Sequence, residues 1–243
     1  KVDVVLECTG RFTKKEEVEK HLLAGAQKVI ISAPTKSEDI LTVVKSVNHE
    51  KAKGQTVVAN ASCTTNCIAP IMAVLQENFG VEKSFLTTVH AMTASQRTVD
   101  LANEKDFREG RSASQNIIPS TTGAAIATTL VLPELKNRFD GISLRVPVVC
   151  GSISDIVAVL QKNVTVQDLN NSFIKASKSK KYKGIIAVSD DDFVSSDILG
   201  NEASTIIDLP FTKVVGGNLI KILAWYDNEW GYANRLIEMI DCL

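Results

Sequence analysis

This chain of 243 residues lacks long blocks of one charge sign and long apolar runs. Its 27 basic and 28 acidic residues leave a formal net charge of −1, which argues against nucleic-acid-binding surfaces and polybasic membrane patches. No stretch reaches the ~18 consecutive apolar residues of a membrane-spanning helix, and no signal peptide opens the sequence. Apolar residues still make up 44% of the chain. We therefore expect a soluble, cytoplasmic globular protein with no nucleic-acid or membrane partner.

Histidine is scarce, and the cysteines do not form a framework. The five cysteines are odd in number and irregularly spaced, which favours a reducing compartment over disulfide bonds. Cys63 and Cys67 are four residues apart, but with three histidines in the whole chain a zinc site would be short of ligands. We expect no metal site, a structural thiol at Cys67, and solvated surface positions for His21 and His49.

The first sixty residues follow the pattern of a parallel α/β unit. Short, β-branched apolar runs at residues 2–6, 28–32, 42–47 and 56–59 are typical of strands covered on both faces. Between the first two runs, Thr13 and Glu16 form a predicted capping box for a helix that ends at Gly25. A strand, a helix and a strand within about thirty residues predict a parallel sheet.

The pattern changes after residue 61. An apolar helix is expected from Ser62 to Gly80, bent at Pro70. Later runs at 84–90, 142–149 and 154–160 alternate apolar with polar residues, as antiparallel strands do. Residues 93–118 are polar and poorly periodic, as functional or assembly loops are, and residues 230–243 predict a last amphipathic helix. The predicted class is α/β, with a parallel sheet followed by an α+β domain whose sheet is mostly antiparallel.

The run Ala-Ser-Cys-Thr-Thr-Asn-Cys at residues 61–67 is the strongest local sign of chemistry. A cysteine at a helix start has its thiolate stabilised by the helix dipole, and the free N–H groups there can also hold an oxyanion or a phosphate. His90 ends the strand that follows this helix, so a Cys63–His90 pair of nucleophile and base is geometrically plausible. On spacing alone, a buried structural cysteine remains the competing interpretation.

Further motifs follow the cysteine run in a fixed order. They are Thr-Thr-Val-His at 87–90, Ser-Thr-Thr-Gly-Ala-Ala at 120–125, Arg-Val-Pro at 145–147 and Trp-Tyr-Asp-Asn-Glu at 225–229. With these motifs the whole chain resembles the phosphorylating glyceraldehyde-3-phosphate dehydrogenases. The resemblance implies three regions: residues 1–61 as the C-terminal part of a dinucleotide-binding domain, residues 62–228 as the catalytic domain, and residues 229–243 as a helix that returns to the dinucleotide-binding domain.

The resemblance also implies a role for each matching residue. Cys63 matches the nucleophile and His90 the base in the oxidation of glyceraldehyde 3-phosphate to 1,3-bisphosphoglycerate through a thioester, with NAD as cofactor and NADP left open. Thr93 and Arg145 match the pocket for the substrate's phosphate, and Ser62, Thr64, Thr122 and Gly123 match the pocket for inorganic phosphate. The residues that match the cofactor site are Thr9, Gly10, Phe12, Ser32, Asn228 and Tyr232. A homotetramer is implied as well, with residues 93–118 at its subunit contacts.

Some of these roles have a structural alternative, and some positions depart from the family pattern. Thr122 and Gly123 could instead cap the following helix, and Tyr232 could belong to the core. Ile126 stands where the family usually has lysine, which removes one positive charge near the anion sites. No Gly-x-Gly-x-x-Gly fingerprint for a dinucleotide occurs in these residues. We therefore expect residues 1–243 alone to bind NAD poorly and to show no turnover.

Two other functions remain open at this stage. Erythrose-4-phosphate dehydrogenases share the cysteine motif, although the two phosphate pockets favour the triose enzyme. A non-catalytic fragment that serves as an assembly or interaction module is the second alternative. The missing fingerprint supports this module, whereas the intact Cys63, His90 and Arg145 argue against it.

Overall fold

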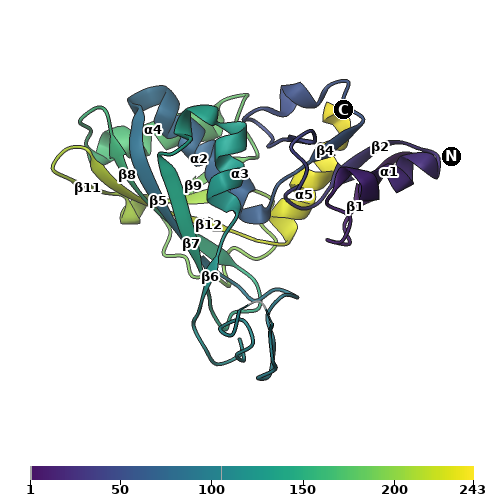
Figure 1. Ribbon diagram of the computed structural model, residues 1–243. Helices are drawn as coiled ribbons and strands as arrows, with labels where there is room; N and C mark the ends of the chain where they lie inside the picture. The colour runs from purple at the N-terminus through teal and green to yellow at the C-terminus, as the bar shows by residue number, and fades with distance from the viewer. Residues whose placement is uncertain (1, 105) are drawn as a thin grey trace.

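The computed structural model describes residues 2–104 and 106–243, which form two sheets of different kinds joined by helices (Figure 1). A four-stranded sheet with the order β1-β2-β4-β3 contains the N-terminal residues, and an eight-stranded sheet contains most of the rest. The predicted α/β class, with a parallel sheet and a mostly antiparallel one, is confirmed.

The four-stranded sheet is parallel throughout. Its strands are β1 (Val2–Glu7), β2 (Ala26–Ile31), β3 (Leu41–Thr42) and β4 (Val57–Ala59), and α1 (Lys15–Leu23) connects the first two. The C-terminal helix α5 (Trp230–Glu238) follows the last strand of the larger sheet, and the residues at its end pack on the smaller, parallel sheet. Leu236 and Met239 share an apolar cluster with Ile30, Val43 and Val58, so the C-terminal segment packs against the N-terminal part of the chain (Figure 1).

The larger sheet runs in the order β6-β7-β5-β8-β12-β10-β9, and β11 pairs with β12. Its strands are β5 (Val81–His90), β6 (Ile118–Thr121), β7 (Phe139–Arg145), β8 (Ser152–Leu160), β9 (Ile186–Ser189), β10 (Thr205–Asp208), β11 (Lys213–Val215) and β12 (Leu219–Tyr226). Two of its pairings, β5 with β7 and β9 with β10, are parallel. The β5–β7 pairing proves decisive for the site, because it brings the C-terminal ends of both strands to one edge.

Helix α2 (Cys63–Phe79) lies in the centre of the main core, and α3 (Ala124–Val131) and α4 (Val166–Lys178) pack beside it (Figure 1). Twelve consecutive residues of α2, from Thr64 to Leu75, are buried. Pro70 lies inside the helix, as expected, and Gly80 ends it with φ 71°. Because α2 is enclosed, its first residue is held in a fixed position relative to the strands around it.

Three local predictions are wrong. The strand expected at residues 142–149 begins earlier, at Phe139, and ends at Arg145. The N-terminal helix is capped by Glu17 rather than Glu16, because Glu17 Oε2 accepts hydrogen bonds from the backbone N–H groups of Thr13 and Lys14, both at 3.1 Å. The expected strand at residues 42–47 ends at Thr42. The Asn48 side chain accepts from Val44 N at 2.8 Å and donates to Thr42 O at 3.0 Å, so a turn takes the place of the remaining strand.

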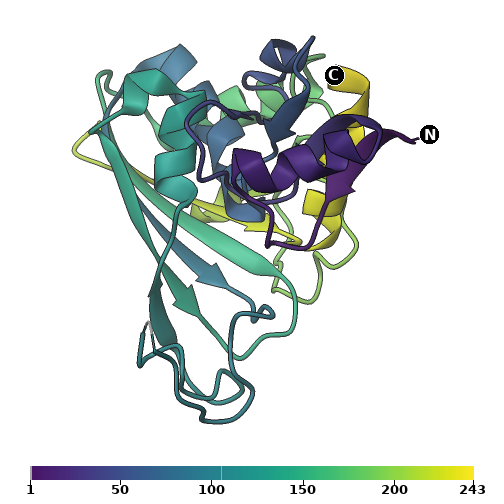
Figure 2. The same cartoon turned by 45° about the vertical axis from the view of Figure 1, so that its right-hand side comes forward.

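Residues 91–117 contain no helix or strand where the structure describes them, and in two views they project from the end of the larger sheet (Figures 1 and 2). Polar contacts hold the segment together. Arg97 and Ser112 form an isolated bridge, and Asp100 accepts from Ser112 N at 2.8 Å and from Arg111 Nε at 3.3 Å. The apolar side chains of Val99, Leu101 and Phe107 are left exposed.

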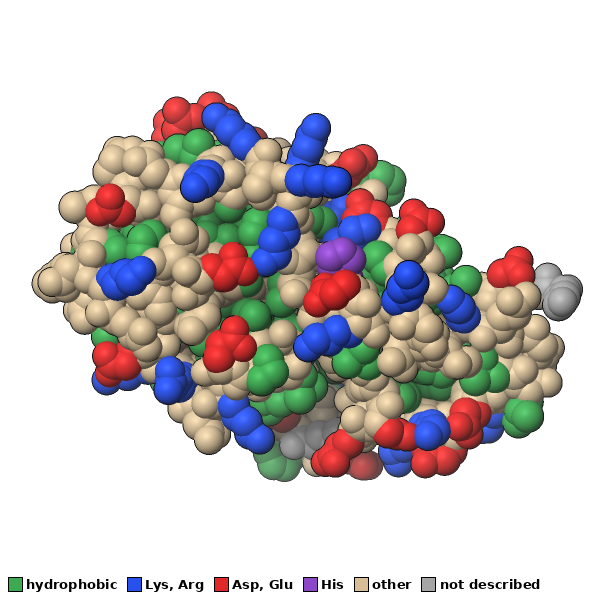
Figure 3. Space-filling model, turned by 90° about the horizontal axis from the view of Figure 1, so that it is seen from above, with side chains coloured by type: hydrophobic (Ala, Val, Ile, Leu, Met, Phe, Trp, Pro, Cys, Tyr) green, Lys and Arg blue, Asp and Glu red, His purple; other side chains and the backbone are tan. Residues whose placement is uncertain are grey.

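The surface seen from above carries basic and acidic side chains intermingled, without a large area of one sign (Figure 3). Among the residues that the structure describes, none of the helices has the length and apolarity needed to cross a membrane. Within the same residues, no group of three or more His, Cys, Asp or Glu side chains is placed to hold a metal ion.

Candidate active site

Cys63 is the first residue of α2, at the point where the chain leaves the parallel sheet. Ser62 is the N-cap, and its Oγ accepts a hydrogen bond from Thr65 N at 3.1 Å. The residue before it, Ala61, adopts φ 52°, an unusual conformation for a residue other than glycine. The sulfur therefore lies at the positive end of a buried helix, beside first-turn N–H groups that have no acceptor within the helix.

His90 is the last residue of β5, and its Nε2 lies 3.5 Å from Cys63 Sγ. The imidazole is buried, and burial together with the charge of Arg145 lowers the pKa of His90 to about 4. Burial also raises the pKa of the Cys63 thiol, despite the opposing effects of Thr64 and Arg145. The helix start and the nearby His90 were together expected to lower the pKa of Cys63, and this expectation is wrong because burial outweighs both. At neutral pH the pair is a thiol beside a neutral imidazole.

Arg145 reaches the same place from β7. The parallel register pairs it with His90, and Arg145 Nη1 lies 2.6 Å from His90 Nδ1 and 3.2 Å from Ala91 O. Ala91 O is in turn 2.7 Å from His90 Nδ1. The three residues Cys63, His90 and Arg145, distant in the sequence, thus form one continuous cluster.

Tyr226 supports this cluster from β12, and the sequence analysis did not single it out. Its hydroxyl lies 3.0 Å from Thr64 Oγ1 and 2.8 Å from Thr88 Oγ1, and its ring meets the His90 ring nearly edge-on at 6.0 Å. The ring is buried, and burial raises the pKa of Tyr226 far above its usual range. Its position inside the Trp-Tyr-Asp-Asn-Glu motif was the available signal.

Asn228 is anchored through its side-chain oxygen, which accepts from Gly151 N at 3.1 Å and from Ser152 Oγ at 2.9 Å. Ser152 Oγ also accepts from Ala91 N at 3.0 Å, so one buried hydroxyl connects Asn228 to the strand end that carries His90. Asp227 holds the neighbouring turn by accepting from Glu229 N and Trp230 N. It also accepts from Cys150 Sγ, and burial and this carboxylate raise the pKa of Cys150 to about 11.

The sequence is also similar to known proteins. The family model "Glyceraldehyde 3-phosphate dehydrogenase, C-terminal domain" matches residues 62–228. A glyceraldehyde-3-phosphate dehydrogenase of Streptomyces coelicolor is 53% identical over 240 residues, which are 98% of this chain and 71% of the relative. Those of Geobacillus stearothermophilus and Chlamydia pneumoniae are 50% and 48% identical, over 98% and 99% of this chain and 71% and 72% of their own lengths.

The chain belongs to the glyceraldehyde-3-phosphate dehydrogenase family. Membership of this family implies a dehydrogenase, a class of oxidoreductase. The roles of individual residues rest on the geometry described above and on the residues that follow.

The hydroxyls expected to bind anions already have partners within the protein. Thr93 Oγ1 lies 2.9 Å from both Ser95 Oγ and Gln96 Oε1, and Met92 N donates to Val148 O, which brings this turn beside the loop that follows Arg145. Thr122 Oγ1 accepts from Ala124 N at 3.2 Å and so caps α3, whose N-cap is Gly123. Ser62 and Thr64 are bonded to Thr65 and Tyr226, as described above.

Four of the residues expected to line the cofactor site follow the carboxyl ends of β1 and β2, namely Thr9, Gly10, Phe12 and Ser32. Glu7 is buried and accepts from Thr9 N at 2.8 Å and from the Thr9 hydroxyl, while its backbone oxygen accepts from Ser32 N. Gly10 adopts φ 68°, which favours glycine, and leads the chain toward Phe12. Thr9, Phe12 and Ser32 therefore lie on one edge of the sheet, where open α/β sheets bind ligands.

His21 belongs to this edge, and its expected position as a solvated surface group is wrong. Its Nε2 lies 2.6 Å from Glu7 Oε2, and its ring is 5.7 Å from that of Phe12. Although burial opposes it, hydrogen bonds from Thr9 and His21 hold the pKa of Glu7 below its usual range.

Tyr232 connects the two halves of the site from α5. Its hydroxyl donates to Ala61 O at 3.3 Å, directly before the cysteine helix. Burial raises the pKa of Tyr232, and the nearby thiols Cys63 and Cys8 contribute to the rise. This side chain therefore lies between the parallel sheet and the sulfur.

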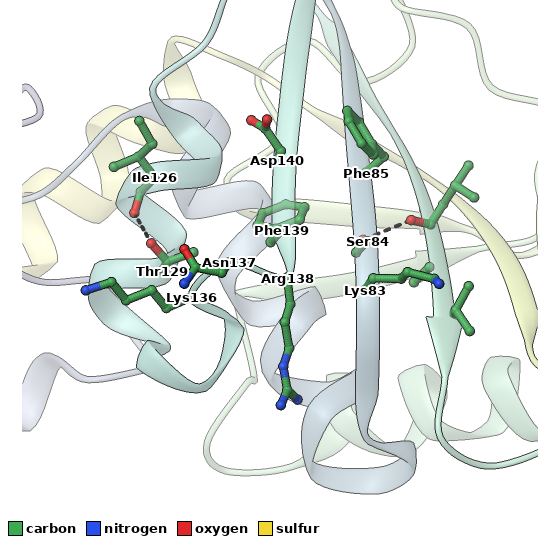
Figure 4. A pocket seen from close by; sticks show the side chains of 13 residues that line it. Lys83, Ser84, Phe85, Ile126, Thr129, Lys136, Asn137, Arg138, Phe139 and Asp140 are labelled. Atoms are coloured by element: carbon green, nitrogen blue, oxygen red, sulfur yellow. Dashed lines mark hydrogen bonds between the residues drawn. The ribbon is translucent and has the colours of Figure 1, made fainter.

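A hollow on the described surface lies elsewhere, between α3 and the strands β5, β7 and β8 (Figure 4). Its volume is about 820 Å³, and Phe85, Ile126 and Phe139 are among the side chains that line it. Ile126, which replaces the lysine usual in the family, is 67% exposed there. The hollow's lining does not include Cys63, His90 or Arg145.

Proposed function

We propose that this chain carries the catalytic centre for the oxidation of glyceraldehyde 3-phosphate to 1,3-bisphosphoglycerate. The single observation that carries the proposal is the Cys63 Sγ–His90 Nε2 contact of 3.5 Å at the start of a buried helix. A thiol that is protonated at rest needs a base within reach when it attacks a carbonyl, and His90 is that base.

In the proposed reaction, Cys63 Sγ attacks the aldehyde carbon as His90 Nε2 takes the thiol proton. The aldehyde oxygen takes that proton back from His90 Nε2 and becomes the hydroxyl of a thiohemiacetal, held near the first-turn N–H groups of α2. His90, neutral again, accepts the proton of that hydroxyl while a hydride leaves the carbon, which gives a thioester on Cys63. Inorganic phosphate attacks the thioester carbonyl, the bond from the carbonyl carbon to Cys63 Sγ breaks, the acyl phosphate departs, and Cys63 takes the proton from His90.

NAD is the proposed hydride acceptor, and it supplies this redox chemistry when bound. The donor set fits it: the Asn228 amide oxygen is tied to Gly151 and Ser152, so its N–H groups are left for a carbonyl oxygen such as that of the nicotinamide amide. Thr9, Gly10, Phe12 and Ser32 would line another part of the site, and Tyr232 would lie beside the reactive face.

We further propose that Arg145 and Thr93 bind the substrate's own phosphate, and that Ser62, Thr64, Thr122 and Gly123 surround the attacking phosphate. Arginine matches a phosphate in charge and geometry. The hydroxyls would need to exchange their present partners, so the arginine carries most of the expected recognition. Residues 93–118, with their exposed Val99, Leu101 and Phe107, would lie at the subunit contacts of a homotetramer.

The test is turnover with and without the nucleophile. The protein to assay is this chain joined to the remaining N-terminal segment of the Geobacillus stearothermophilus relative, beside residues 1–243 alone. NADH formation from glyceraldehyde 3-phosphate, phosphate and NAD should be abolished by Cys63→Ala and retained by Cys67→Ala. Turnover that survives Cys63→Ala would refute the proposal. If the joined protein oxidises erythrose 4-phosphate faster than glyceraldehyde 3-phosphate, erythrose 4-phosphate is the substrate. If the joined protein folds but has no activity, an assembly module is the better interpretation.

A further inference from the structure

His90 Nδ1 lies within hydrogen-bond distance of two groups that make opposite demands on it. Ala91 O, at 2.7 Å, can only accept, so this contact requires a proton on Nδ1. Arg145 Nη1, at 2.6 Å, can only donate, so this contact requires the Nδ1 lone pair. A neutral imidazole carries a single N–H. The two contacts are therefore alternatives, and each belongs to a different tautomer of His90.

The two tautomers present different groups to Cys63, whose Sγ is 3.5 Å from Nε2. With the proton on Nδ1, the Nε2 lone pair faces the thiol and can take its proton. With Arg145 donating to Nδ1, the proton lies on Nε2, and the ring cannot accept another from the sulfur. The depressed pKa of His90 keeps the ring neutral near pH 7, so the choice between tautomers decides whether a base is present.

Arg145 is suited to leave this position when an anion arrives. Its Nε is buried and has no hydrogen-bond partner among the residues that the structure describes, a costly arrangement for a charged group. An oxyanion would supply that partner and could accept from two nitrogens of the guanidinium at once. Of the groups that face His90, Cys63 from α2, Tyr226 from β12 and Arg145 from β7, the arginine carries the charge at neutral pH.

We propose that Arg145 switches the tautomer of His90, so that a phosphate-bearing substrate activates the base that attacks it. At rest the guanidinium occupies Nδ1 and keeps the proton on Nε2. An anion draws Arg145 away, the Nδ1 proton bonds to Ala91 O, and Nε2 is free to accept the Cys63 proton. This role rests on the proposed function, in which Arg145 binds the substrate's phosphate. It adds a positioning role that acts through His90.

Nitrogen-15 NMR of protein labelled at histidine measures the tautomer directly, and the chain has only three histidines to assign. Wild type without anion should carry the proton on Nε2 of His90. Arg145→Met should move it to Nδ1, and saturating inorganic sulfate should do the same in wild type. Arg145→Gln serves as a second variant if the methionine disturbs folding. The matched control is Arg138→Met, which changes an exposed arginine directly before the same strand. An Nδ1–H tautomer in anion-free wild type would overturn the proposal.

Alkylation of Cys63 by iodoacetamide at pH 7 gives a second readout that needs no turnover. The switch predicts alkylation about tenfold faster in Arg145→Met, and faster in wild type with sulfate. Simple electrostatics predicts the reverse, because removing or neutralising the arginine raises the thiol pKa. Slower alkylation in both cases would refute the switch. If Arg145→Met loses turnover while the His90 tautomer stays unchanged, the switch is refuted and the proposed function stands. If the tautomer changes as expected but the wild-type protein has no turnover, the proposed function is refuted and the switch stands.

Discussion

The N-termini of α2 and α3 are built from similar residues and have different surroundings. Ser62 caps α2 and Thr122 caps α3, and hydroxyl side chains cluster at both helix starts. Helix α2 is enclosed by the core, and His90 and Tyr226 are brought to its first turn. Helix α3 has eight residues, and its Ile126 and Leu130 are exposed. The same kind of helix N-terminus thus meets an imidazole where the surrounding strands supply one, which is the arrangement that the proposed reaction needs, and among the described residues meets none at α3.

The largest expected effect comes from removing the base that distinguishes α2. His90→Asn should lower the rate of aldehyde oxidation by roughly 10²–10⁴-fold, the range for loss of general base catalysis. Binding of NAD, measured by calorimetry, should stay within about twofold because the substitution does not touch Asn228 or Tyr232. A loss of rate below tenfold would mean that His90 does not act as the base.

The stability of the protein at acid pH should also depend on His90, because this residue is buried in its neutral form. The pKa of His90 is about 4 in the folded protein against 6.5 for an unperturbed histidine, so the unfolded chain binds the proton more readily. The contribution of neutral, buried His90 to the free energy of unfolding is complete above pH 6.5. It falls by about 3 kcal/mol as the pH falls to 4. Urea unfolding at pH 7 and pH 4 should therefore show a smaller acid loss for His90→Asn than for wild type. Equal losses in the two proteins would contradict the assigned burial of His90.

The two anion pockets should respond to different substitutions. Arg145→Ala removes a charge-assisted hydrogen bond worth about 1.5–3 kcal/mol and should raise KM for glyceraldehyde 3-phosphate by roughly 10–100-fold. Thr122→Val should act mainly on KM for inorganic phosphate. Steady-state kinetics with each substrate varied separately measures both, and equal effects of the two variants on both substrates would show that the pockets are not distinct.

The smallest effects concern the caps themselves. Ser62→Ala should lower the free energy of unfolding by about 1 kcal/mol, because Thr65 N loses its acceptor. Gly123 has an ordinary helical conformation, and an added Cβ would meet nothing within 4 Å. Gly123→Ala should therefore change the free energy of unfolding by less than about 0.5 kcal/mol. A higher KM of this variant for inorganic phosphate would then mean that the added methyl group blocks the phosphate, and not that the fold is disturbed. Chemical denaturation of the two variants under identical conditions compares them.

The pair Cys63 and His90 could be predicted from the sequence because each residue lies at the end of a regular element. A capped apolar helix locates Cys63, and a strand of clear alternation locates His90. The parallel pairing of β5 with β7 could not be predicted, since alternation gives the faces of a strand and not its direction. Arg145 was therefore identified through family resemblance alone.

Other contacts could not be predicted because side-chain hydrogen bonds overrode the structure that the local hydrophobic pattern indicated. Asn48 ended an apolar run that looked like a strand, and Glu7 drew His21 out of solvent. The Tyr226 hydroxyl joins threonines from α2 and β5, residues that no spacing rule connects. Such contacts depend on tertiary packing and cannot be found by examining one element at a time.

The in-register pairing of His90 with Arg145 also has a consequence for how the protein folds. The two residues lie 55 positions apart in the sequence, and Thr64 meets Tyr226 across 162 positions. Contacts of such long range form late, because loop closure precedes them. A slip of one residue between β5 and β7 would turn one of the two side chains to the opposite face of the sheet. We therefore expect this cluster to be completed late in folding, so that the reactivity of Cys63 would report that β5 and β7 have reached their native register.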